Sequence, residues 1–170
     1  LRLLGLKEDR EETRAGDADA VRRIVDALDR MEPALARYMA AFAYLLGRVA
    51  YADREVSPEE TRLMERIVME RGALPEDQAV LVVQIARSQN LLFGGTEDFL
   101  VARQFEQMAT LEQKLALLDC LFGVAAADGS ITVVEDNEIA RIARELKIEH
   151  ADVVRSRLAH REYLRVLQRP

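Results

Sequence analysis

The sequence predicts an all-α fold, a bundle of roughly eight helices with an internal pseudo-twofold duplication. Two observations support this: apolar residues recur at helical spacing, and no segment shows the strict alternation of a half-buried strand. A third observation is an acidic helix–turn–helix unit that occurs twice. Asp53 and Glu60 in the first copy correspond to Asp128 and Glu135 in the second, at a constant offset of 75 residues.

The N-terminal part of the chain changes character at Asp17. Residues 1–16 are charged and poorly periodic, so we expect a mobile or loosely docked segment before a single helical domain over residues 17–170. From Asp17 the apolar residues follow the i, i+3, i+4, i+7 spacing of one helix face. Pro33 suits a first helical position, and residues 34–52 are apolar nearly all round, as in a buried central helix.

The next predicted helix has a strong start signal. Ser57 is its expected N-cap, Pro58 its first residue, and Glu60 stands three residues after the cap, which together form a capping box with a proline start. Gly72 ends this helix. Pro75 begins another short helix, whose acidic start and length favour a helix over a strand.

The second half repeats this organisation after the Gly94-Gly95 pair, the clearest turn signal in the chain. Thr96 is the expected cap of a helix that reaches Met108, and residues 111–127 form the second apolar central helix. Gly129 is expected to end that helix in a left-handed conformation.

Helical patterning then continues to the end of the chain. Thr132 and Glu135 repeat the capping box, and the helix they open carries an inward apolar stripe. A last helical stretch over residues 149–167 is expected to break near His160.

The acidic repeat has two interpretations. In the first, Asp53 and Asp128 lie at the negative ends of helices, where a bound divalent cation would compensate them and Glu60 and Glu135 would reach across the turn. A donor set made of oxygens favours calcium or magnesium over zinc. Further candidate ligands are Glu55, Asp136 and Glu138.

In the second interpretation the same residues serve local structure without metal. An aspartate accepts backbone N–H groups two or three residues further on as an Asx-turn, and Glu60 and Glu135 belong to the capping boxes. Neither copy is an EF-hand. In the second copy, for example, Val124 and Ala126 occupy the first and third ligand positions and offer no side-chain oxygen. The sequence leaves the choice between cation site and capping device open.

The motif of the second copy is Ala126-Ala127-Asp128-Gly129-Ser130-Ile131-Thr132-x-x-Glu135, followed by Ile139, Ile142, Ala143 and Leu146. Through this motif and the first half-copy, residues 35–160 resemble the TerB family, named for tellurite resistance, and the related N-terminal region of the membrane-anchored co-chaperone DjlA. The resemblance implies a compact helical domain, a cytoplasmic setting, and a role in bacterial stress response or tellurite resistance.

The same resemblance implies metal-binding acidic residues at Asp53, Glu60, Asp128 and Glu135. Arg54 replaces the glycine of the pattern in the first copy, which weakens metal binding there more than at Asp128. The His-Pro-Asp tripeptide of the co-chaperone's J-domain is absent from this sequence, so the resemblance implies no chaperone-stimulating activity.

The net charge of −6 argues against general nucleic-acid binding, which requires a basic surface. The arginine-rich tail is the exception, and it is interpreted either as an anion- or partner-binding face or as an ordinary solvated helix surface. The arginines concerned are Arg155, Arg157, Arg161 and Arg165.

No pattern in the chain indicates an enzyme. His150 and His160 are expected to be solvent-exposed, and no serine or cysteine accompanies them as a nucleophile. Cys120 lies in an apolar run and is expected to be a buried, inert thiol. No stretch reaches the roughly 20 apolar residues of a membrane span.

We therefore expect a non-enzymatic module that binds a divalent cation, calcium or magnesium, and acts through a protein or membrane-surface partner. The alternative is a metal-free helical interaction domain, and an unrecognised metalloenzyme is a remote third.

Overall fold

The computed structural model describes residues 2–50, 57–88 and 98–164, and within them it contains eight α-helices and no strand. This confirms the predicted all-α class. The helices are α1 (Arg2–Asp29), α2 (Pro33–Ala50), α3 (Pro58–Gly72), α4 (Glu76–Arg87), α6 (Asp98–Met108), α7 (Leu111–Ala125), α8 (Val133–Glu145) and α9 (His150–Ala159). Two short 3-10 helices, η1 (Ala126–Asp128) and η2 (Arg161–Tyr163), follow α7 and α9. None of the described helices is both long and apolar enough to cross a bilayer.

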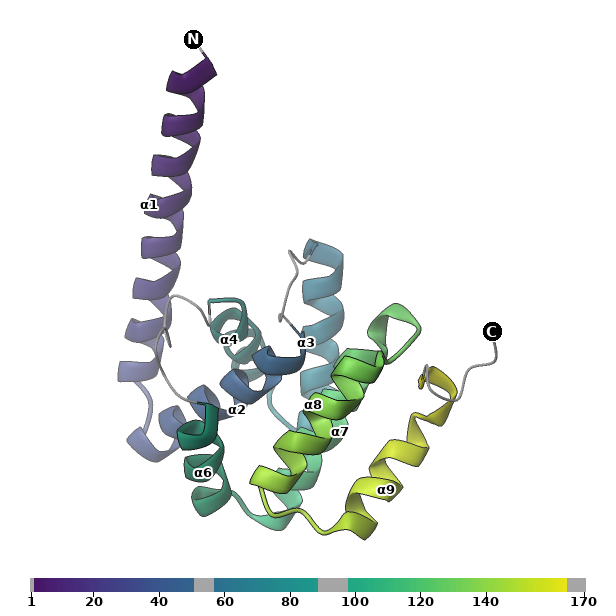
Figure 1. Cartoon of the computed structure of the whole chain (residues 1–170). Coiled ribbons are helices and arrows are strands. Elements are labelled where there is room, and N and C mark those ends of the chain that lie inside the picture. Colours follow the sequence, from purple (N-terminus) through teal and green to yellow (C-terminus); the bar gives the residue numbers. More distant parts are fainter. Residues whose placement is uncertain (1, 51–56, 89–97, 165–170) are drawn as a thin grey trace.

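Helix α1 begins at Arg2, although the amphipathic pattern begins only at Asp17. Residues 2–16 contain no proline and are rich in leucine, arginine and glutamate, which are good helix formers, so the helix continues through them. Figure 1 shows the first half of α1 extending away from the bundle, and the helix packs against α2 and α4.

The two apolar central helices are α2 and α7. Helix α2 packs against α4, α6 and α7, while α7 packs most extensively against α3 (Figure 1). An aromatic group anchors α2 to α6: the ring centroid of Phe105 lies 5.4 Å from that of Tyr38 and 6.3 Å from that of Phe42. The largest fully buried side chains of α2 and α7 are Met39, Phe42, Leu45, Leu46, Leu117, Leu118, Leu121 and Phe122.

Within the described residues, three helices begin with a complete capping box. Ser57 and Thr132 cap α3 and α8 as predicted, and each hydroxyl accepts a hydrogen bond from the backbone N–H three residues on. A third box opens α7, where Thr110 pairs with Gln113, a cap that the sequence reading missed. Since each box satisfies two otherwise orphaned N–H groups, these helix starts are fixed locally.

The end of α3 depends on two small residues. A Cβ atom on Gly72 would lie 3.2 Å from Cζ of Phe42, so the glycine permits close packing of α3 on α2. The left-handed position falls on the next residue, Ala73, with φ of 55°. The predicted turn at Gly94-Gly95 and the cap at Thr96 lie outside the described residues.

The last helical stretch breaks at the predicted place, since α9 ends at Ala159 and His160 leads into η2. Beyond η2, Leu164 is completely buried and forms an isolated parallel bridge with Ile131. The chain thereby returns to the turn between α7 and α8 (Figure 1).

Candidate cation site

Three of the four repeat carboxylates line one cavity. Glu60 comes from the first turn of α3, Asp128 from the end of η1, and Glu135 from the first turn of α8. The cavity has a volume of about 70 Å³. Since a single water needs roughly 10–15 Å³ by this kind of measure, the cavity has room for an ion with a few waters. The remaining lining residues are Ala50, Leu63, Met64, Val124 and Ala127.

Asp128 stands in an Asx-turn, as the metal-free interpretation expects. Its Oδ1 accepts a hydrogen bond of 3.2 Å from the backbone N–H of Ser130. Gly129 between them has φ of 94°, the left-handed conformation predicted for it, and this conformation lets the chain turn directly after η1.

Both glutamates serve as capping residues at the same time. Oε2 of Glu60 accepts the N–H of Ser57 at 3.2 Å, and Oε1 of Glu135 accepts the N–H of Thr132 at 3.0 Å. The second oxygen of each carboxylate makes no hydrogen bond within the described part of the chain. A carboxylate has about four lone-pair positions, so capping leaves capacity for a ligand role.

Asp53 and Glu55 fall outside the described residues, so the structure does not place these two predicted ligands. Ala50, which lines the cavity, precedes Asp53 by three residues. Among the described residues alone, no three acidic, histidine or cysteine side chains converge closely enough to hold a metal ion.

The additional candidate Asp136 does not line this cavity. Arg157 on α9 binds it with two parallel hydrogen bonds, from Nε to Oδ1 at 3.1 Å and from Nη2 to Oδ2 at 3.0 Å. The hydrogen bond with Asp136 raises the pKa of Arg157 against the opposing effect of burial. Two predicted groups, an acidic ligand and a member of the arginine face, are therefore bound to each other.

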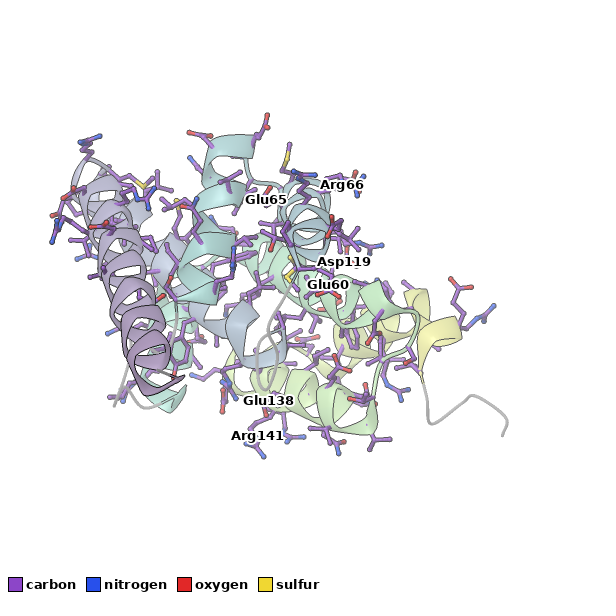
Figure 2. All side chains as sticks on the ribbon, turned by 90° about the horizontal axis from the view of Figure 1, so that it is seen from above. Glu60, Glu65, Arg66, Asp119, Glu138 and Arg141 are labelled. Carbon is purple, nitrogen blue, oxygen red and sulfur yellow. The ribbon has the colours of Figure 1, made fainter. Side chains whose placement is uncertain are left out.

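Glu138, the other additional candidate, also has cationic partners. Its Oε1 accepts a 2.8 Å hydrogen bond from Nε of Arg48 on α2, and its Oε2 lies 3.6 Å from Nη1 of Arg141. Figure 2 shows Glu138 beside Arg141 and apart from Glu60.

Arg48 is a buried charge that the sequence pattern did not predict. Its side chain is 4% exposed and also donates from Nη1 to Oε2 of Glu145 at 2.8 Å. Burial acts to lower the pKa of Arg48, but the hydrogen bonds that it donates to Glu145 and Glu138 outweigh this effect and raise the pKa. The available signal was a single arginine late in the apolar run of residues 34–52, since a charge buried there requires a paired carboxylate.

The other described members of the predicted arginine face are open to solvent. Arg155 is exposed and lies 3.1 Å from Asp152 one helical turn earlier, and Arg161 is exposed on η2. Arg165 lies outside the described residues. An exposed i,i+3 ion pair of the kind made by Arg155 contributes little to stability.

The expectation that His160 is solvent-exposed is wrong. Its exposure is 3%, and its ring stacks on Phe122 with centroids 5.6 Å apart. The distance from Nε2 of this ring to Nη1 of Arg71 is 2.8 Å. The reason is that α9 ends at Ala159, so the chain turns back onto α7 and takes the histidine with it. His150 is exposed at the start of α9, as expected.

Cys120 is completely buried, as expected. Burial, with a smaller contribution from the charge of Asp119 and against the effect of Arg71, raises the pKa of its thiol to about 12. A thiol that stays protonated is a poor nucleophile and a poor metal ligand.

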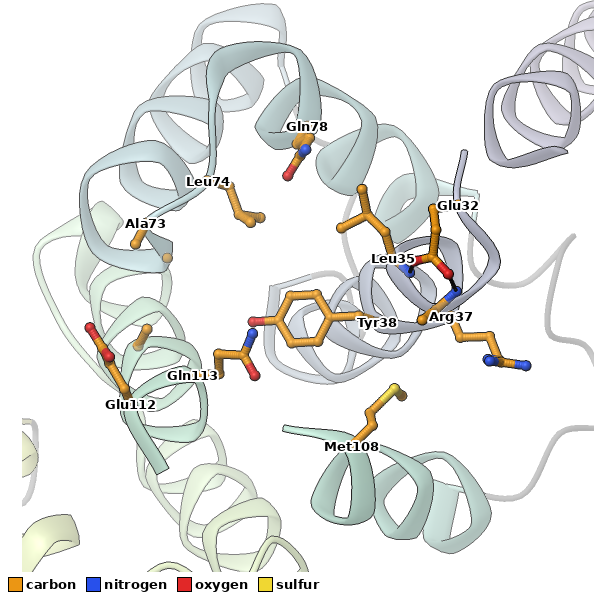
Figure 3. A pocket seen from close by; sticks show the side chains of 13 residues that line it. Glu32, Leu35, Arg37, Tyr38, Ala73, Leu74, Gln78, Met108, Glu112 and Gln113 are labelled. Atoms are coloured by element: carbon orange, nitrogen blue, oxygen red, sulfur yellow. Dashed lines mark hydrogen bonds between the residues drawn. The ribbon is translucent and has the colours of Figure 1, made fainter. Parts of the chain in front are cut away.

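A larger cavity of about 570 Å³ lies between the start of α2, the end of α3, α4, the end of α6 and the start of α7. Figure 3 shows the ring of Tyr38 extending into it between Leu74 and Met108. Burial raises the pKa of the Tyr38 hydroxyl to about 12, so this group stays protonated. The cavity is lined by neither cysteine nor histidine.

One comparison with known proteins gives a match. The family model described as "Tellurite resistance protein TerB" matches residues 38–158. No curated protein and no solved structure matches the chain. The matched span includes both acidic turns and excludes α1, His160 and Leu164.

Proposed function

Since the chain belongs to the family of the tellurite resistance protein TerB, we propose that it is a non-enzymatic, divalent-cation-binding module of bacterial stress response or tellurite resistance. It acts in the cytoplasm through a protein or membrane-surface partner, and its ion is calcium or magnesium. The observation that carries the cation site is that Glu60, Asp128 and Glu135, which are far apart in sequence, line one small cavity.

The charge distribution around the cavity supports this site. Asp136 and Glu138 are neutralised by arginines, whereas Glu60 and Glu135 form no ion pair within the described residues. Asp128 adds a third negative charge just after the C-terminal end of α7, where the helix dipole is also negative. A divalent cation would neutralise this concentration of charge.

The donor chemistry points to the class of ion. Carboxylate oxygens are hard ligands, which bind calcium and magnesium in preference to softer metals. Both ions accept water as part of their coordination, and the cavity has room for it. Asp53, within three residues of the cavity-lining Ala50, is the further ligand that the proposal requires.

The alternative function is a metal-free helical interaction domain. The observation that favours it is that the Asx-turn of Asp128 and the two capping boxes already give each acidic residue a structural role. The two functions differ in what the negative charge does, because capping needs only an acceptor oxygen whereas cation binding needs the charge.

The third capping box shows how to separate these roles. Gln113 performs in α7 the same capping function that Glu60 and Glu135 perform in α3 and α8. Glu60→Gln and Glu135→Gln therefore retain the caps and remove the charges. Thermal unfolding of chelator-treated protein is followed while calcium, magnesium, manganese or zinc is added.

We expect the wild-type midpoint to rise with calcium or magnesium, with stabilisation near 2.7 kcal/mol when the ion is at about 100 times its Kd. The two glutamine variants should match the wild type without metal and lose this response. A wild type that does not respond to any ion supports the metal-free domain instead. A response that survives in both variants places the ion outside this cavity.

A further inference from the structure

The last described residues of the chain return to the acidic turn. Leu164 is 0% exposed and forms a parallel bridge with Ile131, which is 1% exposed and stands three residues after Asp128. We propose that residues 160–164, here called the C-terminal strap, position the turn that carries Asp128, with His160 as the residue that fastens the strap. This inference rests on the cation-binding function proposed above.

The turn that carries Asp128 is held from both sides. Gly129 has open space around it, with no atom within 4 Å of the position that a Cβ would take. On one side the turn is fixed by η1, whose Ala126 carbonyl accepts the N–H of Gly129 at 2.9 Å. On the other side it is fixed at Ile131, where Leu164 lies. The strap therefore provides an anchor on the far side of Asp128, next to the capping box of Thr132.

His160 ties the strap to two other helices. Its ring stacks on Phe122 of α7, and its Nε2 lies 2.8 Å from Nη1 of Arg71 on α3. The other nitrogen, Nδ1, lies 3.1 Å from the backbone oxygen of Ser156 in α9, the helix that precedes the strap. Both ring nitrogens and one ring face are thus engaged, and the imidazole is 3% exposed.

These anchoring helices are the ones that supply the acidic cavity. Helix α3 carries Glu60 in its first turn and Arg71 in its last, while α7 leads into η1 and Asp128. The strap thereby contacts both of these helices, α3 at its last turn through Arg71 and α7 through Phe122. The strap lies beyond residues 38–158 of the family match, so the match assigns it no role.

The first test compares two buried aliphatic residues of similar size. Leu164→Ala removes the contact with Ile131, and Ile24→Ala, at a 2% exposed position of α1, creates a similar loss of packing away from the acidic turn. Both variants should unfold at lower denaturant concentration. Only Leu164→Ala should weaken calcium or magnesium binding, by about tenfold or more, as is typical when a support of a metal ligand is lost.

The second measurement needs no cation and separates this inference from the proposed function. Amide hydrogen exchange in chelator-treated protein is measured at residues 129–131. Leu164→Ala should accelerate it at least tenfold more than Ile24→Ala does. If the wild type binds no ion but this exchange difference is found, the cation function fails and the positioning role of the strap stands. Equal exchange in the two variants overturns the strap proposal.

His160 provides a third test with a conservative variant. In His160→Gln the side-chain amide oxygen can still accept from Arg71, whereas His160→Ala removes that acceptor. We expect the alanine variant to increase exchange at residues 129–131 and the glutamine variant to restore much of the protection. Equal exchange in both variants and the wild type shows that His160 does not fasten the strap. Should Leu164→Ala fail to fold, the milder Leu164→Val replaces it in both measurements.

Discussion

Arg71 and His160 are 89 residues apart in sequence, yet Nη1 of the arginine lies 2.8 Å from Nε2 of the histidine. A guanidinium has only donors, so Nε2 must be the acceptor. The backbone oxygen of Ser156, 3.1 Å from Nδ1, is only an acceptor, so Nδ1 must carry the proton. The two partners therefore select the neutral imidazole with its proton on Nδ1.

This tautomer can be tested directly because the chain has only two histidines. Nitrogen NMR of the rings at neutral pH should show one histidine with a protonated Nδ1 and an unprotonated Nε2, and a slowly exchanging ring N–H. His150→Gln should leave that signal in place, since His150 is exposed. A His160 ring protonated on Nε2 would contradict the assigned hydrogen bonds.

Gly123→Ala should disturb the contact between Arg71 and His160 by displacing Arg71. A Cβ on Gly123 would lie 2.8 Å from Cδ and 2.9 Å from Nε of Arg71, so the flexible arginine must move. Alanine favours helix by about 1 kcal/mol over glycine, which offsets the lost contact. We expect a free energy of unfolding within about 1 kcal/mol of the wild type, together with faster exchange of the His160 ring N–H.

The matched control for this change is Gly16→Ala in α1, where no atom lies within 4 Å of the added methyl group. It should stabilise the protein by up to about 1 kcal/mol and leave the His160 signal unaltered. Denaturant unfolding and ring NMR on both variants give the comparison. An unaltered His160 signal in Gly123→Ala would mean that Arg71 moves without releasing the histidine.

Arg48→Met should be far more destabilising than a similar change on the surface. It removes the cation between Glu138 and Glu145, so that Glu145 loses this partner and Glu138 keeps only the exposed Arg141. We expect this to cost about 3 kcal/mol in urea unfolding. Arg141→Met removes a 63% exposed partner of the same Glu138 and should cost less than about 1 kcal/mol.

A triple variant identifies the cause of the Arg48 effect. Adding Glu138→Gln and Glu145→Gln to Arg48→Met removes the unpaired charges, so part of the lost stability should return. No recovery would show that the loss comes from packing of the arginine side chain instead of its charge.

Local signals in the sequence were sufficient for most of the helices. Ser57 and Thr132 begin helices because each cap and its glutamate lie within three residues of one another. Gly129 ends the α7 segment because its left-handed conformation is a property of one residue. Such features depend on neighbours in sequence and can be predicted without tertiary structure.

The ion pairs and the buried histidine depend on distant partners instead. Arg48 meets Glu138 across 90 residues and Glu145 across 97, and nothing in the local pattern selects these carboxylates among 30 acidic residues. For the same reason the repeated sequence motif predicted which acidic residues to compare, while the cavity that Glu60, Asp128 and Glu135 line became visible only in the folded chain.

Ser156→Ala should raise stability. Oγ of Ser156 is buried and has no hydrogen-bond partner among the described residues, so its removal relieves an unsatisfied polar group. Alanine is also the better helix former, and we expect a gain of about 0.5–1.5 kcal/mol in denaturant unfolding. Ser57→Ala, at an N-cap whose hydroxyl is bonded, should instead lose about 1 kcal/mol. A loss in Ser156→Ala would reveal a partner for that hydroxyl.

The buried thiol predicts a loss of stability at alkaline pH. Burial raises the pKa of Cys120 from its ordinary 9.0 to about 12, with Asp119 adding to the effect and Arg71 opposing it. The unfolded thiol ionises first, so this residue's contribution is intact below pH 9 and declines as pH rises from there toward 12, by at most about 1.4 kcal/mol per pH unit. Urea unfolding of Cys120→Ala across this range should show a shallower decline than the wild type, and equal slopes would contradict the assignment.

The position of Cys120 also makes its thiol a built-in probe of how often the helical bundle opens. The chain has a single thiol, and that thiol, on α7, is fully buried in the hydrophobic core. An alkylating reagent therefore marks a molecule only after the centre of the bundle has come apart, so the labelled fraction over time counts such events without an engineered probe. The same enclosure means that two folded copies cannot become covalently linked under oxidising conditions, whereas unfolded chains can.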